Sequence, residues 1–131
     1  MRKILFFVFS IFILISLAGC NQTSSANNNV LSQDEAITMV IKDHPEFPSN
    51  KVDTLTKKLP IGGPSGTTAD VKFTTNIEKS SGNAYTVNLI KDWGLTVKGK
   101  YIKSYWKYKV TPDKVVLIEK VDNDYLVATM K

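Results

Sequence analysis

The apolar and polar positions of the chain follow three successive patterns. Residues 4–17 are apolar except for two serines, and residues 21–29 contain no apolar residue larger than alanine. Within residues 31–131, apolar residues recur first at helical spacing and then, from about residue 51, at every second position. The pattern predicts an apolar leader, a polar linker and one folded domain.

The first element of the domain is predicted to be a helix that begins after Ser32. Ser32 and Glu35 match a capping box, and Asp34 and Glu35 suit the positive end of the helix dipole. The His44–Pro45 pair is expected to end the helix, because the residue before a proline avoids helical backbone angles. The side chains expected on its buried face are Ala36, Ile37, Val40, Ile41 and His44. A helix of about three turns needs a surface to pack on.

Alternation with a period of two predicts five or six strands after the helix. The predicted strands are residues 51–59, 71–77, 85–89, 95–110, 115–121 and 125–130. Ser80–Asn83 is predicted to be the turn of a hairpin, and residues 111–114 and 122–124 are predicted to be later turns. The long strand over residues 95–110 is expected to be broken or bulged near Gly99.

One helix followed by sequential strands predicts an α+β domain. The helix is expected to pack on one face of a curved antiparallel β-meander of five or six strands. Residues 21–29 cannot bury enough surface to offset the entropy of ordering them, so they are expected to be a flexible tether with a root-mean-square reach of about 15–18 Å.

The start of the chain has the layout of a secretory signal peptide. Arg2 and Lys3 precede the apolar run, and Leu17-Ala18-Gly19-Cys20 closes it with small residues before the single cysteine. A helix made of residues 4–17 reaches only about 21 Å, less than the roughly 30 Å of a bilayer's hydrocarbon core. The leader is therefore predicted to be a signal peptide rather than a membrane span.

The tetrapeptide Leu17-Ala18-Gly19-Cys20 resembles the lipobox of bacterial lipoproteins at every position. The resemblance implies cleavage between Gly19 and Cys20, so that residues 1–19 are the signal peptide and residues 20–30 are a lipidated cysteine with its tether. It also implies a diacylglyceryl thioether on Cys20, acylation of the palmitate type and an anchor on the extracytoplasmic face of the cell membrane. The modification would consume the single cysteine, so no thiol is left for a disulfide, a metal centre or catalysis.

The charge of the chain is mildly basic. The 131 residues carry a net charge of +5 at pH 7. Arg2 and Lys3 lie in the predicted signal peptide, so the mature protein would carry about +3. A dedicated nucleic-acid binder concentrates far more positive charge, and no nucleic-acid partner is expected.

Candidate catalytic and metal-binding residues are few. His44 is the single histidine and is expected to be a half-buried structural residue, with a Ser-His-Asp triad around it as the alternative. Asp122 and Asp124 lack the glycine and the distal glutamate of a calcium loop and are expected to belong to a turn. Residues 60–68, with Gly62–Gly66, lack the spacing of a phosphate loop or a nucleophile elbow and are expected to be a mobile loop at the rim of a binding surface. We therefore expect no catalytic residue, no metal and no cofactor.

The main functional signal is Tyr-Ile-Lys-Ser-Tyr-Trp-Lys-Tyr-Lys at residues 101–109. In one strand, Ile102, Trp106, Tyr108 and Val110 would point to the core. The opposite face, which we call the Lys/Tyr face, is the candidate binding surface and consists of Tyr101, Lys103, Tyr105, Lys107 and Lys109. Three interpretations remain open: a solvated face whose lysines prevent edge pairing, a protein-binding surface, and a surface for anionic lipid, wall polymer or DNA.

The order of lipobox, polar tether, helix and meander resembles the small cystatin-like-fold lipoproteins of low-GC Gram-positive bacteria, some of which conjugative elements carry. The Gln-x-Val-x-Gly loop of protease-inhibiting cystatins is absent, so inhibition is not implied. The nuclear-transport-factor-like fold, a related alternative, usually has more helix. The resemblance implies a non-enzymatic module that binds an envelope or surface protein, including an exclusion protein that acts on conjugation machinery. The alternative is a binder of anionic lipid or wall polymer.

Overall fold

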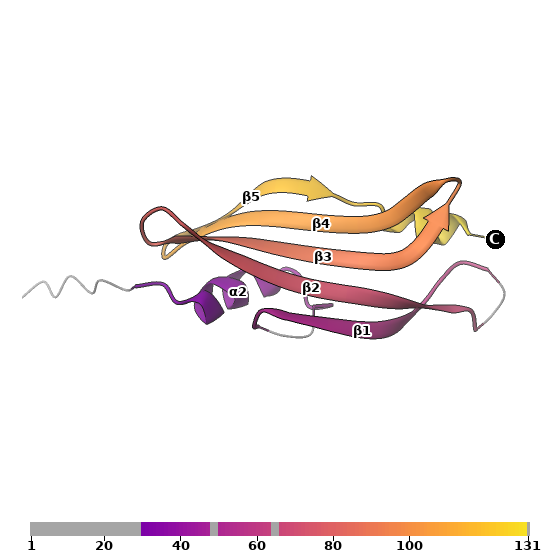
Figure 1. The fold of residues 1–131 in the computed structure, drawn as a ribbon, viewed down its shortest axis with the longest axis horizontal. Helices are drawn as coiled ribbons and strands as arrows, with labels where there is room; N and C mark the ends of the chain where they lie inside the picture. Colours follow the sequence, from indigo (N-terminus) through magenta and orange to yellow (C-terminus); the bar gives the residue numbers. More distant parts are fainter. Residues whose placement is uncertain (1–29, 48–49, 64–65, 131) are drawn as a thin grey trace, which may run out of the picture.

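The computed structural model describes residues 30–47, 50–63 and 66–130 (Figure 1). The predicted signal peptide, the lipobox and the predicted tether as far as residue 29 lie outside these ranges. In chain order the elements are α2 (Gln33–Ile41), β1 (Asp53–Pro60), β2 (Thr68–Ser80), β3 (Ala84–Val97), β4 (Lys100–Thr111), β5 (Lys114–Val121) and the 3₁₀ helix η1 (Asp124–Thr129).

Within the described residues, five strands form one antiparallel sheet in the order β1-β2-β3-β4-β5. Helix α2 contacts β2, β3 and β4, and it lies on one side of the sheet in Figure 1. The face of the sheet that α2 covers is the inner face, and the opposite face is the outer face. The predicted α+β class, with one helix on an antiparallel meander, is confirmed.

The core fills the space between α2 and the inner face. Its largest fully buried side chains include Phe73, Ile37, Leu89 and Ile102. Burying a side chain of this size stabilises the fold by about 1.5–3 kcal/mol. Strands β2, β3 and β4 each supply such a residue, so the three central strands form the sheet's part of the core.

Helix α2 begins as the sequence predicts and ends earlier. The backbone N–H of Glu35 donates to Ser32 Oγ at 3.2 Å, and the backbone N–H of Ser32 donates to Glu35 Oε2 at 2.8 Å, which completes the capping box. The helix ends at Ile41, and a turn in which the His44 N–H donates to the Ile41 carbonyl follows it. His44 lies after the end of the helix, but its side chain is buried, as the sequence predicts.

The predicted hairpin around Ser80–Asn83 is confirmed, and its strands are longer than predicted. Strands β2 and β3 pair continuously from Lys72 opposite Asp92 to Ser80 opposite Ala84. The turn predicted at residues 111–114 is also confirmed, since Thr111 pairs with Lys114. Proline at the second position of this turn supplies the backbone angle that a type I turn requires there.

The single strand predicted over residues 95–110 is wrong. Val97 pairs with Lys100, so the chain reverses at Lys98 and Gly99, whose φ angles are 51° and 75°. Two consecutive positive φ angles are the feature of a type I′ hairpin turn. Lysine is not among the residues that favour this turn, so the sequence indicated an interruption at Gly99 and not a reversal.

The last predicted strand, over residues 125–130, is also wrong. Residues Asp124–Thr129 form η1, and the Asp124 N–H donates to Asp122 Oδ1 at 3.2 Å. Val127 is buried. A short, nearly continuous apolar run does not distinguish a strand from a helix by periodicity. The side chain of Asp124, described below, holds this segment against the inner face instead of beside β5.

The loop predicted at residues 60–68 is shorter, because Pro60 and Thr68 pair as the ends of β1 and β2. Gly62 packs against η1: its N–H donates to the Val127 carbonyl at 3.3 Å, and a Cβ at Gly62 would lie 2.4 Å from the Met130 carbonyl oxygen. This glycine therefore has a packing role that the sequence did not reveal.

Candidate functional site

The Lys/Tyr face lies on the outer face of β4, as the alternation predicts. Lys103 and Lys109 are exposed, and Tyr101 exposes 53% of its surface. The five residues between and after them are buried against the inner face: Ile102, Ser104, Trp106, Tyr108 and Val110. The five side chains of the Lys/Tyr face are thus displayed in one row on a central strand.

Both tyrosine hydroxyls of this face donate hydrogen bonds to carboxylates. Tyr101 Oη donates to Asp92 Oδ1 at 2.7 Å, and Tyr105 Oη donates to Glu119 Oε1. These hydrogen bonds raise the pKa of both tyrosines. Each ring is therefore held in place on the surface by a neighbouring strand.

Carboxylates on the neighbouring strands also lie opposite two lysines of this face. In the register of the sheet, Lys103 lies opposite Asp92 on β3, and Lys107 lies opposite Glu119 on β5. Opposite charges on neighbouring strands reduce the field that the lysines project into solvent. The row is consequently less basic than β4 alone suggests.

His44 belongs to a buried aromatic cluster. Its Nε2 shares a hydrogen bond of 2.7 Å with the Tyr108 hydroxyl, and its Nδ1 lies 3.3 Å from Glu46 Oε1. Its ring packs against Phe47 and Trp106. Burial, together with the negative charges of Asp43 and Glu46, raises the pKa of Tyr108. Tyr108 and Glu46 occupy both ring nitrogens, and neither residue is the serine of a triad.

A second polar cluster surrounds Asp124 and was not predicted. Lys91 Nζ lies 2.5 Å from Asp124 Oδ2, while Trp93 Nε1 and Ser104 Oγ donate to Asp124 Oδ1 at 2.9 and 2.7 Å. Burial alone would raise the pKa of Asp124, but the hydrogen bonds from Lys91, Ser104 and Trp93 outweigh it, and the pKa is lowered. This cluster connects η1 to β3 and β4.

Asp122 has a different role from its neighbour. Its Oδ1 accepts the backbone N–H of Asp124, and its Oδ2 lies 3.3 Å from Lys120 Nζ. The predicted turn between two strands is wrong, because β5 is followed by η1; Asp122 accepts a local hydrogen bond where the two elements join, whereas Asp124 is a core contact. Only the proximity of Lys91 and Ser104 in the folded sheet distinguishes the two aspartates.

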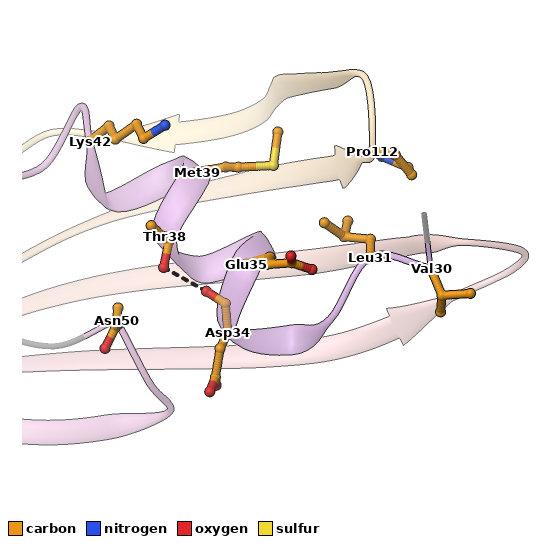
Figure 2. Close-up of a pocket in the computed structure, with 9 residues that line it drawn as sticks. All are labelled: Val30, Leu31, Asp34, Glu35, Thr38, Met39, Lys42, Asn50 and Pro112. Carbon is orange, nitrogen blue, oxygen red and sulfur yellow. Dashed lines mark hydrogen bonds between the residues drawn. The ribbon is translucent and has the colours of Figure 1, made fainter. Parts of the chain in front are cut away.

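An open cavity of about 880 Å³ runs along the solvent side of α2 (Figure 2). It is lined by Val30, Leu31, Asp34, Glu35, Thr38, Met39, Lys42, Asn50 and Pro112. Several of its polar groups stabilise the helix: the Glu35 carboxylate accepts the two hydrogen bonds from Ser32 that lower its pKa, and the Thr38 hydroxyl donates to the Asp34 carbonyl at 2.7 Å. The cavity resembles a surface groove beside a capped helix more than a catalytic pocket.

Within the part of the chain that the structure describes, no group of three or more His, Cys, Asp or Glu side chains is placed to hold a metal ion. None of the helices in the same residues is both long and apolar enough to cross a bilayer. Cys20 and Gly19 lie outside the described residues. Of the predicted site residues, those of the Lys/Tyr face lie within the described part of the chain, so their geometry can be given.

Comparison of the chain with models of protein families, with curated proteins and with solved structures gives no significant match.

Proposed function

We propose that the protein is a lipoprotein on the extracytoplasmic face of the cell membrane, anchored through a diacylglyceryl group on Cys20. Its domain would bind another envelope or surface protein and catalyse no reaction. The lipobox-like sequence Leu17-Ala18-Gly19-Cys20 supports the anchor, and the Lys/Tyr face supports the binding role. A narrower form of the proposal is an exclusion protein of a mobile element that acts on conjugation machinery.

The observation that carries the binding role is the fixation of Tyr101 and Tyr105 on the surface by Asp92 and Glu119. A tyrosine that is already ordered loses little conformational entropy when a partner covers it. Protein interfaces are enriched in tyrosine, whereas an anionic polymer requires concentrated positive charge. Because carboxylates lie opposite Lys103 and Lys107, the face fits a protein better than a polyanion.

We further propose that the meander is curved and that the domain has a cystatin-like fold. The support is the arrangement of a single α-helix on the inner face of five antiparallel strands within the described residues. An experimental structure of the mature protein tests this. A flat sheet, or a sheet with a different strand order, would contradict it.

Mass spectrometry of the mature protein tests the anchor. We expect the chain to begin at Cys20 with a diacylglyceryl group on the sulfur. A Cys20→Ser variant should keep its leader, because serine lacks the nucleophilic thiolate on which the modification depends. An unmodified Cys20, or a mature protein that retains Met1, would contradict the anchor.

Photocrosslinking in the producing bacterium tests the binding role. A photoreactive amino acid at Lys103 should yield a protein adduct, whereas the same group at Lys58, an exposed lysine on the outer face of β1, should not. Replacing both Tyr101 and Tyr105 by alanine should reduce the Lys103 adduct by about tenfold or more, since aromatic interface residues dominate binding energy. Absence of any protein adduct would exclude the proposal.

The alternative of an anionic ligand predicts different results. Binding of the lipidated protein to vesicles with anionic lipid, or to wall polymer, would weaken steeply with salt. Replacing Lys103, Lys107 and Lys109 by serine would abolish that binding. Salt-insensitive protein adducts of the photoreactive group at position 103 that survive the replacement of Lys107 and Lys109 by serine would exclude the alternative.

A further inference from the structure

The two edges of the sheet differ in how they are protected. On β1, Lys57 and Lys58 are charged, Lys57 Nζ donates to the Glu46 carbonyl at 3.0 Å, and Pro60 lacks an N–H. On β5, the middle of the strand is apolar and open, with Val116, Leu117 and Ile118 exposing 43%, 47% and 53% of their surfaces. A free strand edge with apolar side chains favours pairing with another strand.

A β-bulge determines which side chains of β5 share a face. Val116 lies opposite Lys109 and is on the outer face, and Glu119, opposite Lys107, is also on the outer face. Between them the register shifts, because Leu117 and Ile118 together occupy one position of the pleat. Lys114 is therefore two pleat positions before Val116, and Glu119 is two pleat positions after it, on the same face.

This spacing makes β5 self-complementary. In an antiparallel pair of β5 strands with a two-fold axis at Val116, Val116 lies opposite the partner's Val116, and Val115 lies opposite the partner's Leu117. Lys114 then lies opposite the partner's Glu119, and Asp113 lies near the partner's Lys120. Every charged residue in this register meets the opposite charge, and the apolar residues meet one another.

We propose that two copies of this protein pair through β5, in this antiparallel register, to form one continuous sheet of ten strands. The rest of the chain offers no equal occupant for the edge. Residues 21–29 contain no apolar residue larger than alanine, and the apolar residues 4–17 belong to the proposed signal peptide. A second copy supplies both the apolar centre and the complementary charges.

Pairing through β5 would also change the proposed binding surface. This consequence rests on the proposed function, whereas the pairing itself does not. An axis perpendicular to the sheet keeps the outer faces of both copies on the same side, so the two Lys/Tyr faces become one composite binding surface. Anchoring both copies in one membrane raises their effective concentration, so a modest strand–strand contact is sufficient for assembly.

Disulfide trapping of the full-length protein in its membrane tests the dimer and its register. Val116→Cys should form a disulfide-linked dimer, because directly opposite residues have Cα atoms roughly 4.5–5.5 Å apart, within disulfide range. Leu55→Cys on β1, exposed to 39%, is the matched control and should remain monomeric. Ile118→Cys should trap poorly, because it lies two pleat positions from the partner's Ile118. A monomer with Val116→Cys, or better trapping with Ile118→Cys, would overturn the proposal.

Charge exchange supplies a second readout. Lys114→Glu places two carboxylates opposite each other twice in the dimer, and Glu119→Lys does the same with ammonium groups. We expect each to weaken dimerisation by roughly tenfold and the double variant to restore it. No rescue would contradict the register.

The parent protein separates this proposal from the proposed function. A disulfide-linked dimer of the parent would reveal an unmodified Cys20 and would count against the anchor, not against the pairing of β5. A protein adduct at Lys103 together with a monomeric Val116→Cys variant would retain the binding role and exclude the dimer.

Discussion

Both faces of β4 carry tyrosine and polar side chains, but in different roles. On the inner face, Tyr108 bonds to His44 in a buried cluster, and Ser104 bonds to Asp124. On the outer face, Tyr105 and Lys107 lie at the surface beside Glu119 of β5. Tyr105 and Tyr108 belong to the same strand but differ in burial, because successive side chains of a strand point to opposite faces.

This difference indicates where mutations affect stability and where they affect binding. An inner-face side chain cannot be removed without a cavity or an unpaired polar group. An outer-face side chain leaves only a surface contact, which contributes little. The comparison therefore predicts large stability effects on one face of β4 and small ones on the other.

The largest effect is expected for Trp106→Ala. Trp106 is 7% exposed and packs against His44 and Phe47. Its loss should lower the free energy of unfolding by about 3–5 kcal/mol. Denaturant unfolding measures this, with Lys107→Ala on the same strand as the control. If both variants lost equal stability, the two faces of β4 would not differ as described.

A smaller effect is expected for Asp124→Asn. The substitution keeps the shape of the side chain but removes the charge that Lys91 contacts at 2.5 Å. We expect a loss of about 1–3 kcal/mol, because the pair is partly buried and hydrogen-bonded. A double-mutant cycle with Lys91→Met measures the coupling between the two side chains. Additive losses would show that the pair contributes no coupling.

The pH dependence of stability should reflect the same carboxylate. The pKa of Asp124 is lower in the folded protein than its ordinary value of 3.8, so the unfolded state binds its proton more readily. The stabilisation is therefore complete above that ordinary value and is lost as the pH falls through the folded pKa. Unfolding curves between about pH 6 and pH 2 should show a steeper acid loss for the parent than for Asp124→Asn. Parallel curves would contradict this assignment.

The smallest effect is expected for Tyr105→Phe. It removes the hydroxyl that bonds to Glu119 at the surface and should change the free energy of unfolding by less than about 0.5 kcal/mol. Circular dichroism during thermal unfolding measures the change. A loss comparable to that of Asp124→Asn would mean that the outer face stabilises the fold as much as the inner face does.

Features that depend on neighbouring residues were predictable from the sequence. Ser32 and Glu35 cap α2 as expected, because both partners of a capping box lie within one turn. The alternation around Ser80–Asn83 predicted a hairpin that the structure confirms. The row of side chains from Tyr101 to Lys109 was assigned to the correct faces, because the period of a strand is two.

Features that depend on distant residues were not predictable. The carboxylate of Asp124 in η1 contacts Lys91 and Trp93 of β3 and Ser104 of β4. The burial of Phe47 depends on its contacts with Phe73 and Trp106. The bonds of Tyr101 and Tyr105 to Asp92 and Glu119 require the register of three strands, and no local pattern encodes that register.

By itself, the sequence determined the order of elements from α2 to β5, the two faces of β4 and the lipobox-like leader, because each is a local pattern of size, charge or spacing. The tertiary structure alone decided that the chain reverses at Lys98 and Gly99, that η1 packs on the inner face, and that β5 is an apolar edge with no second strand partner among the described residues. The physical reason is that reversal, docking and edge position depend on which strands lie side by side.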